Sequence, residues 1–198
     1  MTYPDSITKE ELSNLPLCGF EGKVVVVDNQ YQITEALEHL QRHDFIGFDS
    51  ETKPSFKKGV INDVSLIQLS THNTCYLFRL NMTGLTDELR ALIENDHITK
   101  IGLSLKDDIR GLRRLTDLKP RGFIDLQEKV ADYGIDDRSL KKIAGIVLNK
   151  RISKKQRLTN WESEILTEAQ QRYAATDAWI CLEIYKELIS TEEYEQLR

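Results

Sequence analysis

Cysteine is scarce in this chain of 198 residues, which contains only Cys18, Cys75 and Cys181. The three are odd in number, lie far apart and show no metal-ligand spacing, so we expect reduced thiols in a cytoplasmic setting. The four histidines also pair with no acid or thiol at a ligand spacing. These absences argue against a zinc site and against a histidine that acts as the base of a reaction.

Long hydrophobic runs are missing as well. No stretch approaches the length of a membrane span, and the N-terminus lacks the charged-then-apolar pattern of a signal peptide, so we expect no membrane partner. Lysine and arginine number 27 against 32 aspartate and glutamate residues, which gives a net charge of -5. This balance argues against a protein that coats nucleic acid non-specifically. It leaves room for a nuclease, because acidic metal ligands and a local basic groove can coexist.

The pattern of apolar residues predicts one α/β domain without repeats or linkers. Thr8 and Glu11 form a capping box before Pro16, so residues 1–22 are expected to be a helical extension that packs on the domain formed by residues 23–198. Two strand-like runs at 64–69 and 75–80 flank the polar stretch 71–74 and predict an antiparallel hairpin. The strands are expected at 24–27, 45–51, 64–69, 75–80 and 100–103, and helices at 34–43, 85–95 and from 167 onward.

The strand at 45–51 ends in two carboxylates one residue apart. Side chains alternate along a strand, so Asp49 and Glu51 point to one face while Phe48 and Ser50 point to the other. The run before them is apolar on both faces, which predicts a central strand covered on both sides. Two acids packed together at such a place would not both stay ionised without a cation. An Asp-x-Glu that merely ends a strand is the alternative.

A second pair of acids, Asp107 and Asp108, falls in the first turn of a predicted helix. Asp108 shares its face with Gly111 and Leu112, the stripe expected to pack inward, whereas Asp107 points elsewhere. Asp108 is therefore a candidate ligand, direct or through water. The alternative is that both acids support the helix start through its dipole.

The third candidate segment is the helix that begins at Thr167, which forms a capping box with Gln170. Tyr173 and Asp177 lie one helical turn apart in line with the apolar stripe, so Asp177 is an acid where packing predicts carbon. Tyrosine in such a stripe usually belongs to the core. Together with Asp49 and the other acids, the chain offers four carboxylates, an oxygen-only set that suits Mg²⁺ or Mn²⁺. Two such ions side by side are a known device for phosphodiester cleavage.

These three blocks, in order and rough spacing, resemble the exonuclease motifs of the DEDD superfamily. A tyrosine four residues before the last aspartate is the mark of the DEDDy branch, and the chain resembles this branch in having one. The branch includes ribonuclease D and the proofreading domains of bacterial repair polymerases. The chain is most similar to the exonuclease domain of the Werner syndrome helicase and its stand-alone relatives. The resemblance runs from about Lys23 to Ile189 and is carried by residues 48–51, 64–69, 75–78, 101–112, 139–142, 160–161 and 173–177.

The resemblance implies a ribonuclease H-like mixed sheet with an antiparallel hairpin, flanked by helices, and two divalent ions, Mg²⁺ or Mn²⁺. Asp49 would bridge both ions, Glu51 and Asp177 would complete the tighter site, and Asp108 would act mainly through water on the second. Tyr173 would orient the attacking water. Hydrolysis would then release nucleoside 5′-monophosphates from a 3′ end.

Substrate contacts follow from the resemblance and from charge. Thr52, Leu103 and Ser104 occupy positions that lie close to the 3′-terminal nucleotide in relatives. Residues 150–157 carry five basic side chains and no acid. This stretch could guide the phosphate backbone or could be a solvated loop. Its candidate phosphate contacts are Lys154, Lys155 and Arg157.

Three functional readings remain open at this point. The first is a 3′-5′ exonuclease on DNA, the second the same enzyme acting on RNA as ribonuclease D does, and the third a module that binds 3′ ends without cutting. Retention of every expected carboxylate and of the tyrosine favours an enzyme. The chain leaves no room for a helicase domain, so we expect single-stranded or recessed 3′ ends as substrates, or help from a helicase or another protein partner, or oligomerisation.

Overall fold

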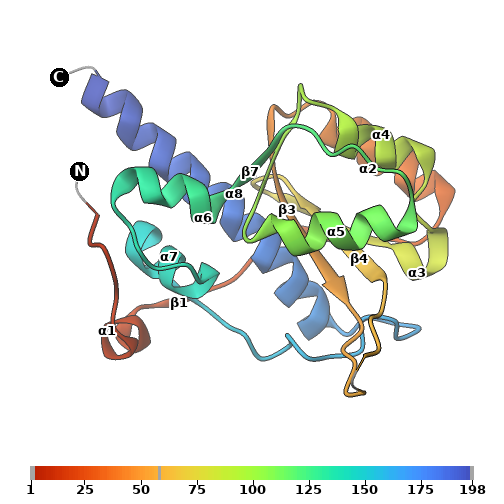
Figure 1. Cartoon of the computed structure of the whole chain (residues 1–198), viewed down its shortest axis with the longest axis horizontal. Helices are drawn as coiled ribbons and strands as arrows, with labels where there is room; N and C mark the ends of the chain where they lie inside the picture. Colours follow the sequence, from red (N-terminus) through yellow and green to blue (C-terminus); the bar gives the residue numbers. More distant parts are fainter. Residues whose placement is uncertain (1–2, 58, 197–198) are drawn as a thin grey trace.

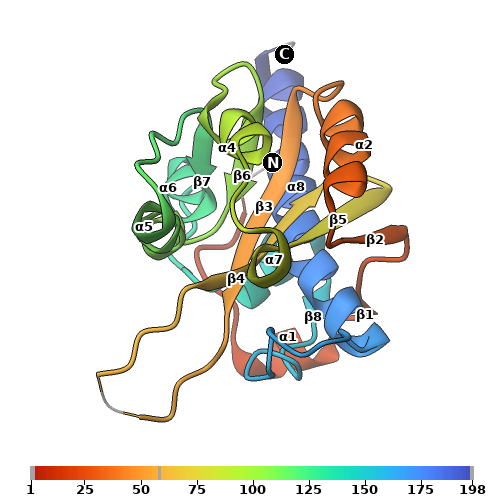
Figure 2. The ribbon, with the colours of Figure 1, turned by 90° about the vertical axis from the view of Figure 1, so that its right-hand side faces the viewer.

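The computed structural model describes residues 3–57 and 59–196. Its centre is a six-stranded mixed sheet with the strand order β2-β5-β4-β3-β6-β7 (Figures 1 and 2). The strands are β2 (Lys23–Val27), β3 (Phe45–Thr52), β4 (Val64–Ser70), β5 (Thr74–Arg79), β6 (Thr99–Gly102) and β7 (Phe123–Asp125). Strand β4 runs antiparallel to both β3 and β5, whereas β3 runs parallel to β6. The predicted hairpin and the central position of the first motif are thus present.

Helices cover both faces of this sheet. One face is covered by α2, α4 and α5, and the other by the long helix α8 (Figure 2). Helix α7 packs against α8. The helices are α1 (Lys9–Asn14), α2 (Gln30–Leu40), α3 (Leu80–Thr83), α4 (Asp87–Glu94), α5 (Leu105–Leu115), α6 (Leu126–Lys129), the 3₁₀ helix η1 (Val130–Tyr133), α7 (Leu140–Leu148) and α8 (Glu168–Gln196). Over the described residues, every helix is too short or too polar to cross a bilayer.

Some boundaries differ from the sequence prediction. Helix α2 begins four residues earlier than expected because Asn29 caps it, its side-chain oxygen accepting from the Gln32 N–H at 3.1 Å. The apolar run at 24–27 lies in the edge strand β2, which pairs only with β5, so most of its valines are half-buried. A short parallel pair of β1 (Leu17–Cys18) with β8 (Arg151–Ile152) was not predicted, because neither segment has a strand-like pattern.

The N-terminal helix forms where the capping box predicts it. The Thr8 hydroxyl accepts from the Glu11 N–H at 3.2 Å, and the Glu11 carboxylate accepts from the Thr8 N–H at 2.8 Å. Leu12 is buried, and a Cβ added at Gly145 of α7 would lie 2.7 Å from its side chain. Helix α1 therefore packs on α7 through Leu12.

Gly47 allows α8 to approach β3 at backbone distance. A Cβ at this position would lie 2.0 Å from the carbonyl oxygen of Ala178. No side chain fits in that space, so glycine is needed for the close crossing. Because Ala178 follows Asp177 and Gly47 lies two residues before Asp49, this crossing sets the separation of two predicted site residues.

We expect Gly47→Ala to lower the free energy of unfolding by about 1–3 kcal/mol, the usual range for an overpacked contact, because α8 must move away from β3. Urea unfolding measures the change. The matched control is Gly19→Ala, whose added Cβ would meet the Thr176 hydroxyl at an ordinary 3.5 Å. Equal unfolding midpoints for the two variants would contradict the close-crossing account.

Candidate active site

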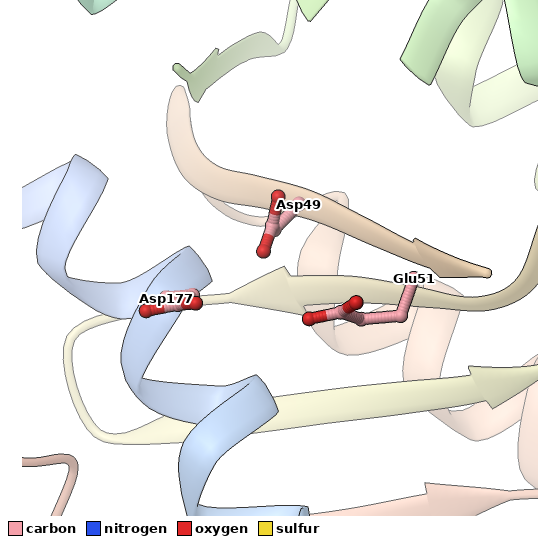
Figure 3. A group of neighbouring side chains, drawn as sticks. All are labelled: Asp49, Glu51 and Asp177. Atoms are coloured by element: carbon pink, nitrogen blue, oxygen red, sulfur yellow. The ribbon is translucent and has the colours of Figure 1, made fainter. Parts of the chain in front are cut away.

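Three carboxylates meet where β3 passes α8. Asp49 and Glu51 extend from β3 toward Asp177 on α8, and ligand oxygens of all three lie within 4.8 Å of one another (Figure 3). Asp177 is 3% exposed, and the other two are half-buried. The side chains that alternation places on one face of β3 therefore meet the side chain that the helical repeat places on the inner face of α8.

Burial and mutual repulsion make this cluster hard to ionise. Burial raises the pKa of Asp49 well above its usual range, and the charges of Asp177, Asp108 and Glu51 raise it further. Burial, followed by the charge of Asp177, raises the pKa of Glu51 to about 8. Burial also raises the pKa of Asp177, against the opposing effect of Lys154. A cation placed among these oxygens would favour the ionised forms.

Lys154 provides one positive charge at this cluster. Its Nζ lies 2.9 and 3.1 Å from the two carboxylate oxygens of Asp177 and 5.6 Å from the ring centroid of Tyr173. One ammonium does not balance three carboxylates. The remaining excess of oxygen ligands, with no sulfur or imidazole among them, fits a hard divalent cation such as Mg²⁺ or Mn²⁺.

Tyr173 stands one turn before Asp177 on the same face of α8. Its side chain is 7% exposed, and its ring lies 6.0 Å from that of Trp161, which is fully buried. Burial, followed by the charges of Asp177 and Glu51, raises the pKa of Tyr173. The hydroxyl therefore stays protonated and can serve as a hydrogen-bonding group.

Asp108 lies apart from the three clustered carboxylates. It is half-buried in the first turn of α5, and its carboxylate accepts a hydrogen bond from the Ser50 hydroxyl. Burial raises the pKa of Asp108 to about 6, while the bond from Ser50 lowers it. Asp107 is exposed and pairs with Arg110 at 2.9 Å. Of the two neighbouring acids, only Asp108 is turned toward β3.

The carboxylate cluster opens into a cleft of about 730 Å³. Of the predicted substrate contacts, Leu103, Ser104, Lys154 and Arg157 line it. Thr52 lies instead in a smaller depression together with Asp108. Lys155 lines a separate cavity beside Cys18 and Arg172. The basic stretch at 150–157 is therefore divided, with only part of it facing the cleft.

Comparison with known proteins decides the family. A sequence profile described as 3′-5′ exonuclease matches residues 24–191. The chain belongs to the 3′-5′ exonuclease family. It is 34% identical to the bifunctional 3′-5′ exonuclease/ATP-dependent helicase WRN of Mus musculus over 88% of this chain and 13% of that protein. It is 30% identical to a 3′-5′ exonuclease of Arabidopsis thaliana over 88% of this chain and 66% of that protein.

Solved structures agree with this assignment. The EXO domain of Nibbler from Aedes aegypti superposes with a TM-score of 0.80 at 26% identity, covering 90% of this chain and 94% of that domain. RNase D of Escherichia coli shares the fold, with a TM-score of 0.75 at 23% identity over 86% of this chain and 46% of that chain. The ribonuclease H-like fold and the nuclease class predicted from the sequence are thereby confirmed. This exonuclease chain spans only 13% and 28% of the first two curated relatives it matches.

One wall of the exonuclease cleft depends on a residue that sequence reasoning missed. Ser104 adopts a left-handed conformation, with φ 60° and ψ 40°, which is unusual for a residue other than glycine. The Asp125 carboxylate accepts from the backbone N–H groups of Ser104 at 2.9 Å and Leu105 at 2.8 Å. Asp125 thus holds the turn that presents Leu103 and Ser104 to the cleft. Its only sequence signal is an acid at the end of a short apolar run.

Gln68 is a second residue that sequence reasoning missed. It pairs directly with Asp49 across β3 and β4, it is fully buried, and neither its amide nitrogen nor its amide oxygen has a hydrogen-bond partner in the structure. Directly opposed side chains lie on the same face of a sheet. A polar side chain within the apolar run of β4 was the available signal. Gln127, Arg138 and Lys141 also line the cleft. Lys141 falls within the segment 139–142 that carries the family resemblance, whereas no local pattern marks Gln127 or Arg138.

Proposed function

We propose that this chain is a metal-dependent 3′-5′ exonuclease of the DEDDy type that hydrolyses nucleic acid, with DNA favoured, and releases nucleoside 5′-monophosphates. The observation that carries the proposal is the meeting of Asp49, Glu51 and Asp177 within 4.8 Å in an open cleft. Buried acids that raise one another's pKa are unfavourable for folding, so their presence calls for a cationic ligand. Exonucleases of this type generally depend on divalent metals.

In this proposal Asp49, Glu51 and Asp177 would hold the divalent metal, Asp49 would serve as a ligand for both ions, and Asp108 would act through water on the second. When bound, Mg²⁺ or Mn²⁺ would supply positive charge to both oxygens of an in-line phosphodiester displacement. Tyr173 positions the attacking water through its protonated hydroxyl. The turn of Leu103 and Ser104 supports the 3′-terminal nucleotide.

Phosphate contacts are assigned to the basic residues of the cleft. Lys154 and Arg157 line it, and Lys154 already bonds to an acid of the cluster. Thr52 and Lys155 are placed further along the substrate, because they lie in neighbouring hollows. Lys155 would contribute mainly through long-range attraction to the phosphate backbone, whereas Thr52 carries no charge.

We expect Tyr173→Phe to lower kcat by about 100-fold while leaving KM within a few-fold, because it removes a positioning hydroxyl and keeps the ring. The packing on Trp161 should persist, so the unfolding midpoint should stay close to that of the unmodified chain. Steady-state kinetics on a labelled oligonucleotide measure both constants. An unchanged kcat would remove Tyr173 from the reacting set.

The decisive experiment compares substrates. Purified protein is incubated with single-stranded DNA, recessed duplex DNA or RNA, each with Mg²⁺ or Mn²⁺. Every substrate carries an end label that reports the direction of degradation. A ladder that shortens from the 3′ end, absent in Asp49→Ala, supports the proposal, and the substrate degraded fastest gives the preference. Degradation of RNA alone would favour RNA 3′ processing. Binding of 3′ ends without cleavage would favour a non-cutting module.

The substrate preference rests on similarity to the mouse protein named as an exonuclease and helicase. RNA remains the second candidate, because the RNase D fold neighbour from Trypanosoma brucei was solved in complex with RNA U12. The ends acted on would be single-stranded or recessed, with a helicase or another protein supplying duplex opening. The three unpaired thiols are compatible with the reducing cytoplasm as the place of action.

A further inference from the structure

The loop between β3 and β4, of which the structure describes residues 53–57 and 59–63, extends well beyond the sheet (Figure 2). We name it the β3–β4 loop. It presents large apolar side chains to solvent: Phe56 is 86% exposed, Ile61 76% and Val60 49%. Exposed apolar side chains gathered on one short segment usually mark a binding surface.

Hydrogen bonds and ion pairs fix the base of this loop. The Lys53 ammonium lies 3.0 Å from the Glu162 carboxylate, and the Asn62 amide donates to the Lys53 carbonyl at 2.6 Å. Arg114 of α5 donates to the Asn62 carbonyl at 3.0 Å and lies 3.5 Å from the Asp63 carboxylate. The loop is therefore anchored at both ends of its base.

Local hydrogen bonds connect described residues near the tip of the loop. The Ser55 hydroxyl bonds to the backbone of Lys57, and the Val60 N–H donates to the Lys57 carbonyl at 3.3 Å. These bonds involve the Ser55 side chain and backbone groups of the loop. The Phe56 ring stays exposed to solvent and can contact a ligand.

The loop starts beside the catalytic cleft. Lys53 follows Glu51 by two residues, and its partner Glu162 is adjacent to Trp161, whose ring lies against Tyr173. A strand that leaves the cleft past Glu51 would meet the β3–β4 loop next. The loop thus begins two residues after a side chain that lines the cleft.

The charge of the loop fits a polyanion. The loop contains three lysines and one acid, Asp63, although the whole chain has a net charge of -5. Lys53 is engaged by Glu162, and Lys57 is exposed near the tip. An exposed aromatic ring next in sequence to an exposed lysine is a combination that can bind unpaired bases and their phosphates.

We propose that the β3–β4 loop binds the single-stranded part of the substrate a few nucleotides before the 3′ end, with Phe56 stacked on a base and Lys57 close to a phosphate. This inference rests on the proposed function, because it describes where the nucleic-acid strand would run after it leaves the same site. The loop would add affinity for longer strands that the cleft alone does not provide.

The test measures binding without cleavage. In the full chain carrying Asp49→Ala, fluorescence anisotropy at low salt with Mg²⁺ gives the Kd of a labelled single-stranded 12-mer and of a dinucleotide. Adding Phe56→Ala should weaken 12-mer binding about tenfold, the size expected for one lost stack, and should weaken dinucleotide binding less. Phe56→Trp should restore 12-mer binding.

Controls separate stacking from charge. Tyr31→Ala removes another exposed aromatic ring, 71% exposed on α2, and should leave 12-mer binding unchanged. Lys57→Gln should reduce the slope of log affinity against log salt by about 0.7, whereas Phe56→Ala should leave the slope unchanged.

Three results would overturn the inference. The first is equal 12-mer affinity with and without Phe56→Ala, and the second is an equal loss for the dinucleotide. The third is Phe56-dependent binding to vesicles rich in phosphatidylserine without any effect on the 12-mer, which would assign the loop to a membrane surface. The proposed function fails separately, if the chain with Asp49 intact cuts no substrate even though the 12-mer binds through Phe56.

Discussion

Asp49→Asn is expected to lower kcat/KM by about 10³-fold or more and, in the metal-free protein, to raise the melting temperature. The loss follows from removing the carboxylate that two ions would share, an effect of several kcal/mol on the transition state. The gain follows from the raised pKa of Asp49, since burial and three neighbouring acids oppose its ionisation. A neutral amide of the same shape removes that repulsion. Opposite changes in activity and stability distinguish a ligand from a structural acid.

Differential scanning fluorimetry in EDTA and steady-state kinetics in Mg²⁺ provide the two measurements. We expect a rise of about 2–4 °C for each kcal/mol gained in a chain of this size. The matched control is Asp107→Asn, which changes an exposed acid paired with Arg110 and should affect neither quantity strongly. Asp177→Asn should lose activity without the same gain in stability, because Lys154 would lose its partner. A fall in melting temperature for Asp49→Asn would contradict the repulsion account.

Local periodicity explains how much of the site could be predicted. The alternation of β3 places Asp49 and Glu51 on one face, and the helical repeat aligns Tyr173 with Asp177. Both patterns lie within single elements, so the sequence alone was enough to select these residues. The meeting of the two elements depends on the contact of Gly47 with Ala178, which no local pattern contains.

The features that sequence reasoning missed all depend on pairing between distant segments. Gln68 matters because the register of β4 sets it opposite Asp49. Asp125 matters because β7 lies beside β6 and brings its carboxylate to the turn at Ser104. Asp108 is the acid of its pair that faces β3, yet its bond to Ser50 required the packing of α5 on β3. The same limit applies to Thr52 and Lys155, which charge and resemblance placed together with residues of the cleft.

Metal-free protein should lose stability as the pH rises from about 5 to 8, and divalent metal should remove most of that loss. The pKa of Glu51 is raised from an ordinary 4.5 to about 8, and that of Asp108 from 3.8 to about 6. Between each pair of values the folded chain holds a proton that the unfolded chain has released. The free energy of unfolding therefore falls with rising pH, by about 1.4 kcal/mol per unit for one full proton.

The two acids should act over overlapping pH ranges. Asp108→Asn should flatten the profile between about pH 4 and 6, and Glu51→Gln between about pH 4.5 and 8, so of the two variants only Glu51→Gln should change the profile above pH 6. Melting temperatures in EDTA across this range should fall by about 5 °C or more between pH 6 and 8 for the unmodified chain.

Binding of Mg²⁺ or Mn²⁺ favours the ionised carboxylates and releases protons, so the increase in melting temperature on adding metal should be larger at pH 8 than at pH 6. The opposite outcome is a metal-induced increase in melting temperature that is equal at both pH values, together with a melting temperature in EDTA that does not change with pH. That outcome would mean that Lys154 already neutralises the carboxylate cluster in the metal-free chain.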